Sequence, residues 1–141
     1  MAVQLNFLSL DVGKARIGVA IANSISRLPS PLTTLRNDGD FLSTLKTIIY
    51  ENQINELVIG LPKNLDDDET EQTAWLRVFY EDLKSKIDLP MHLENESLSS
   101  VRAENDLKAV GRTYAKEDID ALAACYILDD FIKNTQGAIN V

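Results

Sequence analysis

The chain has few or none of the sequence features that define several other protein classes. Cys125 is its only cysteine, so no intramolecular disulfide can form. No apolar run approaches the length of a membrane span, and the amino terminus lacks the basic start and apolar stretch of a secretion signal. These absences exclude a disulfide scaffold, and we expect a cytoplasmic protein without a membrane partner. At 141 residues, with 45% apolar and 26% charged residues, the sequence predicts one globular domain covering residues 1–141.

Positive charge is also scarce. The 14 Lys and Arg residues face 22 Asp and Glu residues, which gives a net charge of −8. Affinity for nucleic acid comes mostly from electrostatic attraction to phosphates. The balance therefore argues against a general nucleic-acid binder, unless a local basic face or bridging metal ions supply the attraction.

The most informative segment is FLSLDVGKARIGVAIA, residues 7–22. Phe7–Leu10 predicts a strand, Gly13 falls where a tight turn is needed, and Ile17–Ala22 predicts the returning strand. Asp11 lies where an unpaired buried carboxylate would be costly. It either has a cation beside it or caps the turn through its side chain. This segment alone leaves both interpretations open.

Hydrophobic periodicity predicts alternating helices and strands in the rest of the chain. We expect a third short strand at Leu32–Leu35, a helix at Asp40–Asn52, a buried strand at Leu57–Pro62, a helix at Glu69–Ile87, a strand at Met91–Glu94, and helices at Ser99–Val110 and Lys116–Asn134. Three antiparallel strands followed by this alternation predict an α/β fold with a mixed five-stranded sheet and helices on both faces.

Three carboxylates occupy unusual positions for acids. Asp11 comes at the end of the first strand, Glu96 follows a later strand, and Asp120 lies at the margin of the apolar face of the last helix. If they share one rim of the sheet, a divalent metal must neutralise their repulsion, and oxygen ligands favour magnesium or manganese. Such a site suits phosphodiester hydrolysis. Among 22 acidic residues, however, three suggestive positions can arise by coincidence.

Five segments resemble the YqgF family of Holliday junction resolvase-like proteins, also described as pre-16S rRNA nucleases. They are LDVGKARIGVA at residues 10–20, PLTTLR at 31–36, VIGLPKNLD at 58–66, ESLSSVRAE at 96–104 and IDALAA at 119–124. The resemblance implies a ribonuclease H-like fold, an acidic triad of Asp11, Glu96 and Asp120, and a loop from Gly60 to Asn64 close to the substrate backbone.

The resemblance also implies an activity. We expect a Mg²⁺- or Mn²⁺-dependent nuclease that cleaves structured nucleic acid, with pre-rRNA processing in ribosome biogenesis as the leading role and branched DNA as the other substrate. The triad would hold the metal. The expected contacts to the substrate backbone are Arg16, Lys63, Asn64 and Arg112. The protein is expected to be a monomer or a weak homodimer.

Departures from the family pattern support a rival interpretation. Asn95 and Ser97 stand where relatives carry an acid and a base, and Asp66–Glu69 is more acidic than the usual loop. Only Arg112 and Lys116 represent the basic stretch that precedes the final aspartate. These losses favour a non-catalytic binding or scaffolding module of the same fold, whereas the retained triad opposes it.

Other reactive or aromatic side chains have simpler interpretations. His92 is the only histidine and is expected to be structural or partly exposed. Cys125 lies in an apolar stretch and is expected to be a small core residue. Trp75 and Phe79 share helical spacing, which is more typical of a core than of a surface that stacks on bases.

Overall fold

The computed structural model describes residues 3–62, 70–96 and 116–135. Its elements are β1 (Asn6–Val12), β2 (Arg16–Asn23), β3 (Ser30–Arg36), α1 (Phe41–Glu51), β4 (Glu56–Leu61), α2 (Glu71–Lys86), β5 (Met91–Asn95) and α4 (Lys116–Asn134). These bounds confirm the corresponding sequence predictions to within two residues at each end. The helix predicted at Ser99–Val110 lies outside the described residues. No helix in the described part of the chain is long and apolar enough to cross a membrane.

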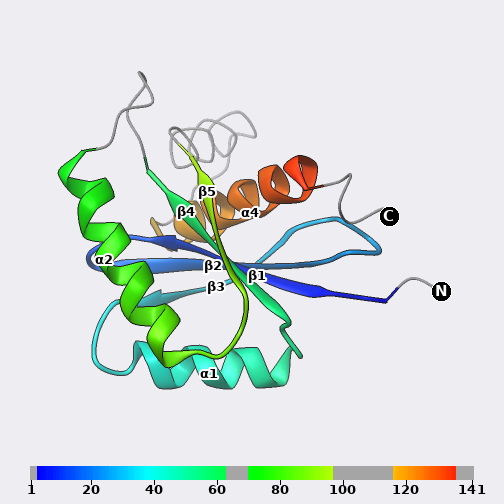
Figure 1. The fold of residues 1–141 in the computed structure, drawn as a ribbon, viewed down its shortest axis with the longest axis horizontal. Coiled ribbons are helices and arrows are strands. Elements are labelled where there is room, and N and C mark those ends of the chain that lie inside the picture. The colour runs from blue at the N-terminus through cyan, green and yellow to red at the C-terminus, as the bar shows by residue number, and fades with distance from the viewer. Residues whose placement is uncertain (1–2, 63–69, 97–115, 136–141) are drawn as a thin grey trace.

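The five strands form one mixed sheet in the order β3-β2-β1-β4-β5. β1 pairs antiparallel with β2, and β2 pairs antiparallel with β3. β4 lies parallel to β1, and β5 lies parallel to β4. The carboxyl ends of β1, β4 and β5 therefore meet at one edge of the sheet, where the β1–β2 turn also lies (Figure 1).

Helices cover both faces of the sheet, as the sequence predicts (Figure 1). α1 and α2 lie on one face, over an apolar cluster that includes Leu10, Leu45 and Leu76. α4 lies on the other face, over a cluster that includes Phe7 and Ile127. Trp75 and Phe79 pack against the first cluster while keeping partial exposure, which confirms their assignment to the core.

α4 packs closely against the sheet because small residues face each other. Ala123 and Ala124 are fully buried, and the Ser9 hydroxyl donates a 2.6 Å hydrogen bond to the Ala124 carbonyl. A Cβ atom added to Gly18 would lie 1.9 Å from the backbone oxygen of Asp120. Gly18 therefore permits the first turns of α4 to approach β2, which places Asp120 beside β1.

The β1–β2 turn is held from two sides. The Gly13 N–H donates to the Arg16 carbonyl at 2.9 Å and closes the turn. Asn37, which follows β3, donates from its backbone N–H to the Ala15 carbonyl and from Nδ2 to the Gly13 carbonyl. The turn is consequently fixed relative to β3 as well as to the sheet.

The first turn of α2 is anchored to the end of β4. Thr70 and Thr73 form a reciprocal capping box, and the Thr73 hydroxyl also donates to the Pro62 carbonyl at 2.6 Å. The helix therefore begins two residues later than the sequence predicts. This anchor places Gln72 at the edge of the sheet where β1 ends.

Candidate active site

Asp11 and Asp120 share a cavity of about 310 Å³ at the carboxyl end of β1. Asp11 comes from the sheet, one residue before the end of β1, and Asp120 comes from the second turn of α4. The remaining lining residues belong to the β1–β2 turn and to α2: Val12, Gly13, Lys14, Ala15, Arg16 and Gln72. Two of the three predicted acids are thus brought together by elements more than 100 residues apart in sequence.

The environment of Asp11 disfavours its charged form. Burial, and after it the negative charge of Asp120, together raise the pKa of the Asp11 carboxyl from 3.8 to about 6. Burial removes the ionised carboxylate from water, and Asp120 repels it, so both causes favour the neutral form of Asp11. A cation bound beside these two carboxyl groups would relieve their repulsion.

Arg16 supplies part of the compensating positive charge. Its Nε donates to Oδ2 of Asp120 at 2.6 Å, and the two side chains are 36% and 18% exposed. Arg16 is predicted from the sequence to contact the substrate backbone. In this structure its guanidinium instead contacts one of the predicted metal ligands.

Glu96 lies at the same edge of the sheet but farther along it. Its backbone N–H donates to the Leu61 carbonyl at 3.0 Å, which extends the β4–β5 ladder by one bond. Two strand spacings of about 4.8 Å separate β5 from β1. By strand alternation from His92, whose ring contacts Phe131 of α4, Glu96 belongs to the α4 side of the sheet. Glu96 therefore lies at the same edge and on the same face of the sheet as Asp11, but two strands away from it.

The predicted three-carboxylate cluster is not assembled. Among the residues that the structure describes, no three His, Cys, Asp or Glu side chains gather closely enough to hold a metal ion. Lys63, Asn64 and Arg112 lie outside the described residues, as do Ser97 and the acidic segment 66–69.

Sequence reasoning missed two residues of the cavity. Lys14 extends from the β1–β2 turn, and its Nζ lies 6.0 Å from the centre of the Trp75 ring, within reach of a cation–π contact. Gln72 reaches the cavity from the first turn of α2. The position of Lys14 in the turn is visible in the sequence, whereas its contact with Trp75 depends on how α2 packs.

His92 and Cys125 have the structural roles that the sequence predicts. His92 is 38% exposed, and its Nε2 lies 2.6 Å from Oε1 of Glu56 on the neighbouring strand. Cys125 is buried in α4, and burial raises the pKa of its thiol to about 11. A thiol with so high a pKa is not a nucleophile near neutral pH.

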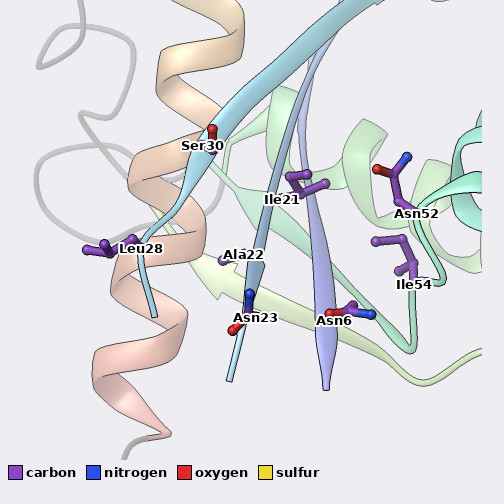
Figure 2. A pocket seen from close by; sticks show the side chains of 8 residues that line it. All are labelled: Asn6, Ile21, Ala22, Asn23, Leu28, Ser30, Asn52 and Ile54. Carbon is purple, nitrogen blue, oxygen red and sulfur yellow. The ribbon is translucent and has the colours of Figure 1, made fainter. Parts of the chain in front are cut away.

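A second cavity, of about 190 Å³, lies near Asn6 and Asn23, at the amino end of β1 and the carboxyl end of β2 (Figure 2). Figure 2 shows Ile21 and Ile54 among its apolar side chains. Its amides are already engaged: the Asn23 side chain accepts from the N–H groups of Ile25 and Ser26, and Asn6 Nδ2 donates to the Gln53 carbonyl. None of the residues lining this cavity is titratable. The Asp11–Asp120 cavity is the candidate active site because it holds two carboxylates close enough for one to raise the pKa of the other.

The chemistry of the donor set fits a hard divalent cation. Asp11 and Asp120 offer carboxylate oxygens only, in a site that the charge repulsion makes receptive to positive charge. Mg²⁺ is commonly held by one or two carboxylates together with substrate phosphates. Two carboxylates in an open cavity therefore satisfy the protein's share of such a site.

Solved structures share this fold. Thermus thermophilus RuvC matches with a TM-score of 0.54 at 10% identity, covering 94% of this chain and 97% of that chain. The RuvC of T. thermophilus in complex with a Holliday junction substrate also matches with a TM-score of 0.54 at 10% identity, covering 93% and 96%. The match confirms the predicted ribonuclease H-like fold.

Sequence comparison reaches further than the fold. A "Putative pre-16S rRNA nuclease" of Maridesulfovibrio salexigens is 35% identical over 132 residues, covering 91% of this chain and 98% of the relative. Proteins of the same name from Roseiflexus sp. and Legionella pneumophila are 37% and 33% identical, covering 89% and 92% of this chain and 92% and 96% of the relatives. The model of the RuvX family, described as Holliday junction resolvase, matches residues 5–134. This confirms the resemblance to YqgF proteins, and the chain belongs to the RuvX (YqgF) family.

Proposed function

We propose that the chain is a divalent-metal-dependent nuclease that hydrolyses phosphodiester bonds in structured nucleic acid. The observation that carries the proposal is the pairing of Asp11 with Asp120 in one cavity at the carboxyl end of β1. Membership of the RuvX family supports the same reaction. In this proposal residues 1–141 form one nuclease domain that works in the cytoplasm, as a monomer or weak homodimer.

The proposed substrate is a precursor of 16S ribosomal RNA, processed at its 5′ end. The names of the similar proteins from Maridesulfovibrio and Roseiflexus support this choice. The family description favours a second candidate, a four-way DNA junction. Both substrates present a folded phosphodiester backbone, so the same acidic cavity would serve either reaction.

In this proposal the chain's own residues have separate tasks. Asp11 and Asp120 hold Mg²⁺ or Mn²⁺, and Glu96 approaches from the same edge of the sheet as a third ligand. When bound, the ion supplies Lewis acidity and a water of lowered pKa. Arg16 neutralises Asp120 when no substrate is bound. When substrate is bound, Arg16 contacts the substrate backbone. Lys63, Asn64 and Arg112 are proposed as further backbone contacts.

A cleavage assay tests the proposal. Purified protein is incubated with a pre-16S rRNA fragment and, separately, with a four-way DNA junction, with Mg²⁺, with Mn²⁺ or with EDTA. We expect cleavage with either metal and none with EDTA or in Asp11→Asn. Asp88→Asn, which alters an exposed aspartate, is the matched control and should cleave like the parent.

The rival function is a non-catalytic binding module of the same fold. The observation in its favour is that Arg16 already contacts Asp120 while Glu96 stands apart. Binding of either substrate without cleavage under any of the metal conditions would establish this rival and contradict the nuclease. Cleavage that Asp11→Asn retains would place the reaction outside the Asp11–Asp120 cavity.

A further inference from the structure

A groove of about 590 Å³ lies directly beside the acidic cavity, and Ala15 and Arg16 line both. Its other walls come from the end of β3 and the connection to α1, and include Thr34, Arg36 and Asn37. Figure 1 shows this connection at the same end of the sheet as the β1–β2 turn. The groove therefore continues the active-site opening across the turn, away from α2.

Two arginines face each other at this groove. Arg16 and Arg36 are directly paired in the antiparallel register of β2 and β3. Paired residues of an antiparallel ladder point to the same face of the sheet, and like charges in that position repel each other. The carboxylate of Asp120 offsets the positive charge of Arg16. Among the described residues no carboxylate forms an ion pair with Arg36, whose side chain is exposed.

This arrangement is unexpected in a chain with a net charge of −8. The chain places two guanidinium groups on adjacent strands beside its acidic pair, where an anion between or alongside them would remove the repulsion. Asp38, which also lines the groove, accepts a hydrogen bond from the Asp40 N–H and repels anions. The part of the groove suited to an anion therefore lies between Arg36 and the β1–β2 turn.

Hydrogen bonds hold one wall of the groove against the β1–β2 turn. Asn37 donates two hydrogen bonds to the turn, one to Ala15 and one to Gly13, so the wall carrying Arg36 keeps its position relative to the acidic cavity. A guanidinium group matches the oxygens of a phosphate with two parallel N–H donors. Contacts of this kind position a nucleic-acid backbone without reading its sequence.

We propose that this groove is a second backbone-binding subsite, in which Arg36 binds a phosphate of the nucleic-acid strand next to the phosphodiester held at Asp11 and Asp120. The strand passes from the acidic cavity over the β1–β2 turn and along the end of β3. The inference deepens the proposed nuclease function and rests on it for the identity of the strand. It makes Arg36 a substrate-positioning residue.

Binding rather than activity tests the subsite. All measurements use full-length protein carrying Asp11→Asn, so that cleavage does not consume the probe. The probe is a fluorescein-labelled RNA hairpin with a single-stranded tail, and anisotropy gives Kd between about 50 and 200 mM salt with Mg²⁺ present. We expect Arg36→Glu to weaken binding about tenfold at the lowest salt and to reduce the salt slope by about 1.

The matched control is Lys46→Glu, which reverses one exposed positive charge on α1, over the opposite face of the sheet from α4. It should leave Kd and the salt slope unchanged. Arg36→Lys retains the charge but loses the guanidinium fork, and should fall between the parent and Arg36→Glu. If Arg36→Glu does not fold, as judged by its melting temperature, Arg36→Gln replaces it.

Two results would overturn the subsite. An unchanged Kd in Arg36→Glu removes Arg36 from the substrate path, and equal weakening by Arg36→Glu and Lys46→Glu shows only an effect of net charge. The fate of the proposed function is decided separately, by cleavage in the Asp11-containing protein. If the Asp11-containing protein cleaves and Arg36→Glu binds the probe as before, the nuclease is retained and the subsite is rejected. If Arg36→Glu specifically weakens binding but no cleavage is seen, the subsite is retained and the nuclease is rejected.

Discussion

Arg16 Nε lies 2.6 Å from Oδ2 of Asp120, and this hydrogen bond joins residues 104 positions apart in the sequence. It ties the start of β2 to the second turn of α4. Asp120 in turn raises the pKa of Asp11, so the guanidinium group of Arg16 directly contacts one member of a repelling acidic pair. In the metal-free protein the guanidinium group therefore offsets part of the negative charge that a divalent ion would neutralise.

Arg16→Ala should lower metal-free stability and raise divalent-ion affinity. Without the guanidinium group, the repulsion between Asp11 and Asp120 is less well offset, and Oδ2 of Asp120 is released for a metal. For a partly exposed pair we expect a loss of about 1 kcal/mol in the free energy of unfolding and a roughly fivefold gain in Mg²⁺ affinity. Thermal melts in EDTA and along a Mg²⁺ titration measure both. Equal Mg²⁺ affinity in the parent and in Arg16→Ala would show that Arg16 does not compete with the metal for Asp120.

Asp11→Asn should stabilise the metal-free protein in a pH-dependent way. The pKa of Asp11 is raised in the folded state, from 3.8 to about 6, so the folded protein binds the proton more tightly than the unfolded chain. The parent therefore loses stability as pH rises from about 4 to about 6, whereas the variant does not. Above that window the variant should be more stable by about 1–3 kcal/mol.

Urea unfolding in EDTA at several pH values measures this difference. The advantage of Asp11→Asn should shrink as pH falls and disappear below the unfolded-state pKa of 3.8, where the parent carboxyl is protonated in both states. Asp88→Asn, at an exposed position, controls for the loss of one negative charge. If the stability advantage of Asp11→Asn does not change with pH, the pKa of Asp11 is not raised in the folded protein.

Gly18→Ala should disturb both the fold and the site. The added Cβ would meet the Asp120 carbonyl at 1.9 Å, so α4 must move away from β2 and carry Asp120 with it. Overpacking of this kind costs about 1–3 kcal/mol or more. We expect a lower melting temperature and weaker Mg²⁺ stabilisation. Gly39→Ala is the control, because nothing lies within 4 Å of its added Cβ, and it should melt like the parent.

The sequence predicts most of the fold because its signals are local. Alternation and apolar periodicity locate the five strands and three of the helices to within two residues. Ala123 and Ala124 are small and fully buried, which fits the close packing of α4 against the sheet. The start of α2 is less accurate because Thr70 and Thr73 cap each other, a reciprocal contact that the predicted helix start at Glu69 overlooks.

The candidate site is predictable only in part. Strand ends and helix margins, together with the family resemblance, identify Asp11 and Asp120, because topology alone brings them to one edge. The contact between Arg16 and Asp120 depends on the depth at which α4 packs, which Gly18 determines through a backbone approach that no periodicity records. The same holds for Lys14, whose position over Trp75 depends on the placement of α2.

Asp120→Asn should abolish metal-dependent cleavage while leaving the fold intact. Two effects on stability oppose each other: Arg16 loses its carboxylate partner, and Asp11 loses a repelling neighbour. We therefore expect the free energy of unfolding to change by less than about 1 kcal/mol, since both side chains of the pair are partly exposed. The pKa of Asp11 should fall toward its ordinary value, because one of the two causes that raise it is gone.

Carboxyl-carbon NMR titration of Asp11 measures that pKa directly, beside the cleavage assay. Asp118→Asn is the matched control, because Asp118 lies two residues earlier on α4 and its side chain is exposed. It should retain cleavage and leave the pKa of Asp11 raised. If Asp120→Asn cleaves as the parent does while Asp118→Asn does not, the metal ligand on α4 is Asp118. If neither variant affects cleavage, α4 supplies no ligand and the acidic pair acts only through its charge.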